Sequence, residues 1–249
     1  MEKISAIIIT KDEEADLRQC LESIKYVDDI VVVDSGSTDN TLGIAKDYTS
    51  SLFVREFDDF SAQKNFAISK CKNNWVLSLD ADEVVSPALG QRLKGFVPGE
   101  EAGYNLKRET YIFGKLMKHG GHDNDMPLRL FDKRKGAFVQ PIHEFVKIKG
   151  KTGLLSEPII HYSTKNINEY MDKLNLYTDS EARFLKEEKA VFFYTKMIFL
   201  PVVRFIQRYI LQKGFMDGEE GFIFYALSGF YIYLKWFKYN ELLKVDRRI

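Results

Sequence analysis

The strongest constraint on the fold is the alternation of apolar runs with amphipathic stretches over the first hundred residues. The run from Ile4 to Ile9 is typical of a buried strand, and apolar residues at helical spacing follow it at Leu17, Cys20, Leu21 and Ile24. Further strand-like runs occupy residues 29–34, 52–55 and 75–79, with a predicted helix after each. Short connections between alternating strands and helices require parallel strands with right-handed crossovers. The sequence therefore predicts an α/β fold with a mostly parallel sheet flanked by helices.

Polar residues follow the predicted strands, at the point where a parallel sheet usually binds its ligand. Thr10, Asp34 and Asp80 each stand at the end of a strand-like run, and Asp82 lies two residues beyond Asp80. Mg²⁺ or Mn²⁺ prefers a few oxygen ligands together with substrate phosphates. Asp80-Ala-Asp82 alone is compatible with a solvated loop as well as with a metal–diphosphate site.

Composition excludes several classes of protein. The 249 residues carry no formal net charge, which argues against a general nucleic-acid binder. Two cysteines, Cys20 and Cys71, are too few for a disulfide framework or a cysteine zinc site, and we expect both to be reduced core thiols. The first ten residues are too short and too strand-like for a signal peptide, so we expect the catalytic part to be cytoplasmic.

The pattern changes after residue 103. From Gly103 to about Ser163, short segments rich in Tyr, Phe, Ile and Val are separated by Gly and Lys, which predicts antiparallel strands closing over the ligand-binding edge. Asn166-Ile-Asn-Glu169 has the spacing of a capping box, and we expect it to open a helix.

The tail over residues 189–249 is basic and aromatic. It carries ten Lys or Arg against five acids, a balance of +5 that leaves the first 188 residues at −5. Aromatic residues beside Lys and Arg are typical of helices that lie in a membrane interface. Core helices are the alternative interpretation, and a bilayer span over residues 222–237 is a third, although that segment is shorter than the roughly 20 residues usually needed.

Four motifs occur in order along the first hundred residues, namely Thr10-Lys-Asp-Glu13, Asp34-Ser-Gly-Ser-Thr-Asp39, Gln63-Lys64-Asn65 and Asp80-Ala-Asp82-Glu83. On these motifs the chain resembles the inverting GT-A glycosyltransferases of family 2, which transfer a sugar from a nucleotide diphosphate. The resemblance implies a Rossmann-like GT-A fold, a UDP-sugar donor and a Mg²⁺ or Mn²⁺ cofactor. It implies these roles for individual residues: Thr10 and Glu13 near the nucleoside, Asp34 at the base, Lys64 near base or phosphate, Asp80 near the ribose and Asp82 on the metal.

Motifs in the second half narrow the resemblance. They are Phe57-Asp-Asp-Phe-Ser-Ala-Gln-Lys-Asn-Phe66, Leu128-Arg-Leu-Phe131, Ile142-His-Glu144, His161 and Gly214-Phe-Met-Asp-Gly218 with Gly221. They look like those of the bacterial lipopolysaccharide inner-core β-1,4-glucosyltransferases that act on heptose. From this likeness together with the patterns above, we expect a nucleotide-sugar-binding half over residues 1–100, an acceptor-binding half over 101–188 and a membrane-associating helical appendage over 189–249.

Inverting transfer requires a base that takes the proton of the acceptor hydroxyl. We expect Glu144 to be this base, with His143 orienting it or touching the phosphate, and Asp125 is the second candidate. His161 ends a strand-like run, and the resemblance to the GT-A enzymes implies that it is a second metal ligand. Arg129 is expected either to bind a substrate phosphate or to pair with a core acid.

These expectations amount to a metal-dependent inverting hexosyltransferase on the cytoplasmic leaflet, with UDP-glucose as donor and a lipid-linked glycan as acceptor. Two other enzymes remain open, a polyprenyl-phosphate sugar synthase and a nucleotidyltransferase, although the latter would want a glycine-rich basic loop where residues 9–14 are acidic. A non-catalytic membrane-bound scaffold with a nucleotide fold is the alternative from another class.

Overall fold

A computed structural model describes residues 1–141, 144–191 and 194–246. The chain divides into two compact units. Unit 1 comprises residues 1–109 and 125–161, and unit 2 comprises residues 110–124 and 162–249. The functional assignments given above to residues 1–100, 101–188 and 189–249 stay predictions.

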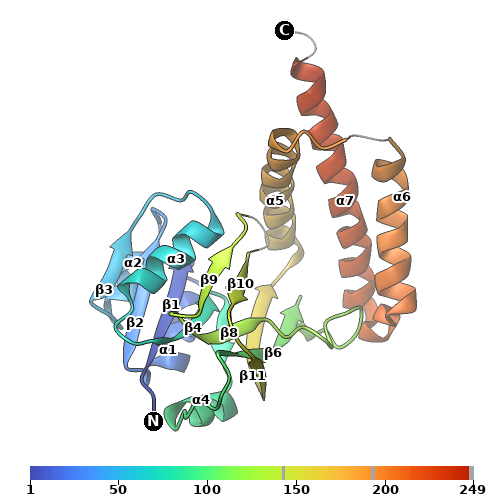
Figure 1. Cartoon of the computed structure of the whole chain (residues 1–249). Coiled ribbons are helices and arrows are strands. Elements are labelled where there is room, and N and C mark those ends of the chain that lie inside the picture. Colours follow the sequence, from blue (N-terminus) through green and yellow to red (C-terminus); the bar gives the residue numbers. More distant parts are fainter. Residues whose placement is uncertain (142–143, 192–193, 247–249) are drawn as a thin grey trace. The chain divides into compact units, whose positions relative to one another are not determined.

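Unit 1 begins with the predicted alternation of strands and helices (Figure 1). In chain order the elements are β1 (Ile4–Thr10), α1 (Leu17–Ile24), β2 (Asp29–Asp34), α2 (Thr41–Lys46), β3 (Ser51–Val54), α3 (Phe60–Lys70), β4 (Trp75–Asp80), β5 (Glu83–Val85) and α4 (Pro87–Lys94). Strand β1 lies between β2 and β4 and is parallel to both. The predicted α/β fold is therefore confirmed.

Two apolar cores cover the faces of this sheet. Along β1, Ile4, Ala6 and Ile8 point to the core that also contains apolar residues of α1 and α4. Ile7 points to the opposite core, which includes Ala67 and Ile68 of α3. Successive side chains of a strand alternate between faces, so an uninterrupted apolar run fills both cores.

Helix boundaries follow local capping. The side chain of Ser86 accepts a hydrogen bond from the backbone N–H of Leu89, and Pro87 occupies the first turn of α4. Cys20 lies on the buried face of α1, and Cys71 is buried where α3 ends. Both thiols are free, as expected.

The remaining strands are β6 (Gly103–Ile112), β7 (Lys115–Leu116), β8 (Leu128–Asp132), β9 (Gly136–Val139), β10 (Phe145–Ile148) and β11 (Thr152–Thr164). The prediction of antiparallel strands is confirmed, but the expectation that they close over the edge is wrong for most of them. The sheet order is β3-β2-β1-β4-β8-β6-β11-β5, so β8, β6 and β11 extend the sheet. Among the strands that the structure describes, β9 and β10 form a separate pair. The backbone groups along β4 need a second partner, and antiparallel β8 supplies it.

Unit 2 is built mainly from helices: α5 (Ile167–Glu187), α6 (Tyr194–Phe205), the π-helical turn η1 (Ile206–Leu211), the 3₁₀ turn η2 (Gly214–Asp217) and α7 (Gly218–Asp246). Asn166 caps α5 by accepting from the backbone N–H of Glu169, as its motif predicts. Helix α7 packs against both α5 and α6 (Figure 1). Of the aromatic residues of α7, Tyr225, Trp236 and Tyr239 are buried and form core, whereas Phe222, Phe230 and Phe237 are exposed.

Among the helices that the structure describes, α7 included, none combines the length and apolar character needed to cross a membrane.

Candidate active site

The ends of the parallel strands place the predicted polar residues at one edge of the sheet. Thr10 of β1 lies opposite Asp34 of β2, and Ile9 lies opposite Asp80 of β4. Thr10, Asp34 and Asp80 are therefore neighbours across three adjacent strands, although up to 70 residues separate them along the chain.

Asp34 shapes the loop that follows β2. Its Oδ1 accepts from the backbone N–H groups of Gly36 and Ser37, both at 2.8 Å. Its Oδ2 accepts from the hydroxyls of Thr10, at 3.0 Å, and Ser37. Asp34 has no exposed surface and Thr10 is only 4% exposed. Both residues therefore hold the loop conformation in this structure, while Glu13 beside them is half-buried.

A buried lysine connects two carboxylates at this edge. Nζ of Lys64, on α3, lies 2.9 Å from Oδ1 of Asp80 and 2.6 Å from Oε1 of Glu144. The lysine side chain is only 3% exposed, against 33% for Asp80 and 17% for Glu144. Burial would lower the pKa of Lys64, but the two carboxylates outweigh this and raise it. Lys64 is therefore a fixed cation between Asp80 and Glu144.

Arg129, on β8, holds the other side of Asp80. Its Nη2 lies 2.6 Å from Oδ2 of Asp80 and 2.6 Å from Oε1 of Glu83. Burial by itself would raise the pKa of Asp80, but Arg129 and Lys64 together hold it well below its usual range. Of the two roles expected for Arg129, pairing with a core acid is the one that the structure shows.

Glu83 is a residue of this cluster that the sequence reasoning missed. It is fully buried, accepts from the backbone N–H of Asp80 at 3.0 Å, and pairs with both Arg129 and Arg108. One signal was available: Arg129 stands within an apolar strand, and a buried arginine requires an acidic partner. The sequence did not show which acid that partner would be.

Asp82 and His161 form the candidate metal pair. Strand β5 pairs with β11 so that Glu83 lies opposite His161, and this brings Nε2 of His161 to 3.3 Å from Oδ2 of Asp82. Both side chains remain partly exposed, at 19% for Asp82 and 16% for His161. The carboxylate oxygen of Asp82 suits Mg²⁺ or Mn²⁺, and imidazole nitrogen is a common ligand of transition-metal ions, so the pair fits Mn²⁺ better than Mg²⁺.

The described residues contain no group of three or more His, Cys, Asp or Glu side chains that could hold a metal ion. A cation at Asp82 and His161 would therefore complete its coordination with water and substrate oxygens, as Mg²⁺ commonly does.

The two candidate bases have different partners. Glu144 is paired with Lys64, whereas Asp125 accepts from Nε of Arg108 at 2.8 Å. His143, expected to orient Glu144, lies outside the described residues. Lys64 therefore links Glu144 to Asp80 at the edge of the sheet. Arg108 links Asp125 to Glu83 instead.

The family model described as glycosyl transferase family 2 matches residues 5–215, which include all of these side chains. The chain belongs to glycosyltransferase family 2. It is an enzyme of the transferase class, and its mixed sheet with flanking helices is a GT-A-like fold.

Several glycosyltransferases match nearly the whole chain. An uncharacterised glycosyltransferase of Rickettsia typhi is 30% identical over 100% of this chain and 90% of its own length. The lipopolysaccharide core biosynthesis glycosyltransferase LpsC of Rhizobium meliloti is 29% identical over 93% of this chain and 89% of its own. Among solved structures, S. aureus TarS in complex with UDP-GlcNAc is 24% identical over 44% of this chain and 35% of its own, with a TM-score of 0.38.

Within the family 2 framework, the candidate site consists of two neighbouring parts. One part is the pair of Asp80 and Glu144, which Lys64 bridges. The other is the pair of Asp82 and His161, and Asp82 lies two residues after Asp80 along the chain. Both parts belong to unit 1.

Proposed function

We propose that this family 2 enzyme is a metal-dependent inverting hexosyltransferase. It transfers glucose from UDP-glucose to a hydroxyl of a lipid-linked glycan, such as the heptose of the lipopolysaccharide inner core. The reaction takes place at the inner face of the cytoplasmic membrane. The whole-length similarity to LpsC supports the substrate class.

The observation that carries the catalytic proposal is the position of Lys64 between Asp80 and Glu144, at 2.9 and 2.6 Å. Such a bridge holds a candidate base at a fixed place beside the strand end where the donor is expected. Residues 1–100 supply the donor side, with Thr10, Glu13 and Asp34 shaping the nucleoside site, and residues 101–188 supply the acceptor side.

The proposed step is a single displacement. The acceptor oxygen attacks the anomeric carbon, the bond from that carbon to the diphosphate breaks, and the acceptor proton moves to the carboxylate of Glu144. Asp82 and His161 would hold the Mg²⁺ or Mn²⁺, which when bound supplies positive charge for the departing diphosphate. Lys64 fixes the orientation of Glu144, and Arg129 keeps Asp80 ionised.

The test is transfer from UDP-glucose to lipopolysaccharide that lacks the added hexose, with and without EDTA, followed by mass and linkage analysis. The proposal expects a gain of one hexose on heptose with inverted configuration at the anomeric carbon, and loss of transfer in EDTA. Retained configuration, or transfer that EDTA leaves unchanged, would contradict it. Transfer to a polyprenyl phosphate that survives Glu144→Gln would identify the rival synthase instead.

A further inference from the structure

Helix α6 and the turn η1 expose their apolar residues and half-bury their arginines. No residue of α6 or η1 is buried. Large apolar side chains are 44–72% exposed at Ile198, Phe199, Val202, Val203, Ile206, Ile210 and Leu211. Arg204 and Arg208 on the same segment are only half-exposed. A helix on a water-facing surface normally shows the reverse arrangement.

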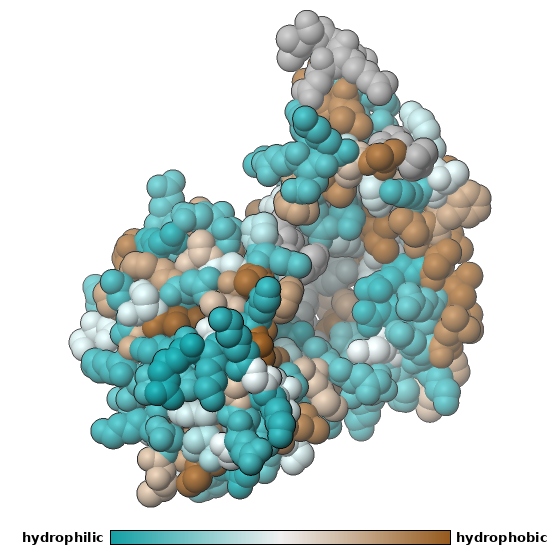
Figure 2. Space-filling view, viewed as in Figure 1, coloured by the Kyte–Doolittle hydropathy of each residue, from teal (hydrophilic) through white to brown (hydrophobic). Residues whose placement is uncertain are grey.

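These apolar residues form one continuous face. Ile198, Val202, Ile206 and Ile210 follow one another at four-residue spacing, and Phe199 with Val203 forms a parallel row. Residues four apart lie on the same side of a helix. Figure 2 shows hydrophobic colour along the edge of the molecule where Figure 1 places α6. We call these six residues the α6 apolar face.

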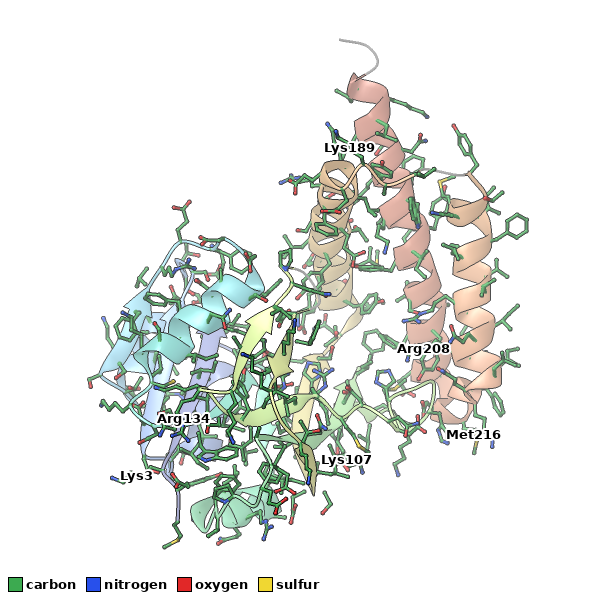
Figure 3. The ribbon with its side chains drawn as sticks, viewed as in Figure 1. Lys3, Lys107, Arg134, Lys189, Arg208 and Met216 are labelled. Carbon is green, nitrogen blue, oxygen red and sulfur yellow. The ribbon has the colours of Figure 1, made fainter. Side chains whose placement is uncertain are left out.

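The segment that carries this face is strongly cationic. Residues 189–213 include five Lys or Arg and no Asp or Glu. Arg204, Arg208 and Lys213 have no acidic partner among the described residues, and the guanidinium of Arg208 instead donates to the carbonyl of Gly120. Figure 3 marks Arg208 and Met216 near the turn that joins α6 to α7, and Met216 there is 57% exposed.

We propose that the α6 apolar face docks onto the surface of an anionic lipid bilayer. Its aliphatic and aromatic side chains would enter the boundary between headgroups and acyl chains, while lipid phosphates would neutralise the uncompensated Lys and Arg. A second copy of the chain is the less favourable occupant, because pairing this segment with itself would bring two acid-free cationic segments together. On helix α7 the aromatic residues Tyr225, Trp236 and Tyr239 are buried, so these three side chains are not part of the docking face.

The experiment is flotation of the full chain with two kinds of vesicle. One kind is made of phosphatidylcholine alone, and in the other about a third of the lipid is phosphatidylglycerol, which is anionic. We expect binding to the anionic vesicles and much weaker binding to the neutral ones. The double variant Val202→Glu/Ile206→Glu changes two exposed residues of the face and should lower the bound fraction at least tenfold. Gln207→Glu is the matched control, because it adds a negative charge at an exposed position of η1 outside the face. It should cost at most about fivefold.

Circular dichroism and thermal unfolding confirm that each variant is folded, and gel filtration without vesicles reports self-association. Failure of the wild type to float with anionic vesicles would overturn the proposal, as would equal flotation of the double variant. A dimer that the double variant dissociates would assign the face to a second copy. The readouts need no turnover, so they are independent of the proposed transfer reaction.

Discussion

Replacing Lys64 by Met is the sharpest test of the candidate site. The substitution keeps an unbranched side chain of similar length but removes the cation that lies 2.9 Å from Asp80 and 2.6 Å from Glu144. Removing one partner of a buried ion pair generally costs about 3–5 kcal/mol, because the other charge stays buried and unpaired. Asp80 keeps Arg129 and is one-third exposed, so we expect the lower end, about 3 kcal/mol.

The assay is thermal and urea unfolding of Lys64→Met beside Lys70→Met, which makes the same chemical change at an exposed position of α3. For a chain of this size, about 3 kcal/mol corresponds to a fall in Tm of roughly 6–12 °C. Lys70 lies over the rings of Phe53 and Phe66, and the loss of such exposed cation–π contacts costs at most about 1 kcal/mol.

The double variant Lys64→Met/Glu144→Gln distinguishes the ion pair from simple packing. It removes the unpaired carboxylate that the single variant leaves behind, so it should be more stable than Lys64→Met alone, with a coupling of about 0.5–3 kcal/mol. If Lys64→Met unfolds within about 0.5 kcal/mol of Lys70→Met, the bridge contributes nothing and the reasoning is refuted.

Three further predictions concern the same site. Glu144→Gln should lower kcat by about 100- to 10,000-fold. Its fall in Tm should be smaller than that of Lys64→Met, because Lys64 keeps Asp80 as a partner. Asp125→Asn should affect turnover far less, and the reverse ranking in steady-state kinetics would make Asp125 the base. Asp82→Ala and His161→Ala should each raise the Mn²⁺ concentration for half-maximal transfer at least about tenfold, and an unchanged Mn²⁺ titration would remove that residue from the metal site. The folded-state pKa of Asp80 is lowered, so its stabilising contribution is complete above the unfolded pKa of about 3.9 and is lost as the pH falls toward the folded pKa. The free energy of unfolding, measured from pH 6 to 2, should therefore depend less steeply on pH in Asp80→Asn than in the wild type. Identical slopes would contradict this.

Much of unit 1 could be predicted because its signals are local. The run from Ile4 to Ile9, the helical spacing after it and the cap at Ser86 each depend on residues within one element. Strand alternation then dictates a parallel sheet, and a parallel sheet brings Thr10, Asp34 and Asp80 to one edge without further information.

Pairing between distant residues could not be predicted in the same way. Lys64 was expected near a base or phosphate, yet its position between Asp80 and Glu144 depends on how α3, β4 and the segment before β10 pack. Glu83 was noted as the last residue of the Asp80-Ala-Asp82-Glu83 motif, but its role could not be predicted. Its pairing with Arg129 and Arg108, at the point where β5 pairs with β11, makes it the buried centre of a charge network.

The basic, aromatic tail shows the same division. The sequence by itself determined its composition, its cationic balance and its helical tendency, because these depend on residue type and spacing alone. Only the tertiary structure decided which face is buried: the aromatics Tyr225, Trp236 and Tyr239 pack inside unit 2, while Ile198, Val202 and Ile206 stay exposed. Burial depends on the neighbours that an element meets after folding, and periodicity along one helix cannot name those neighbours.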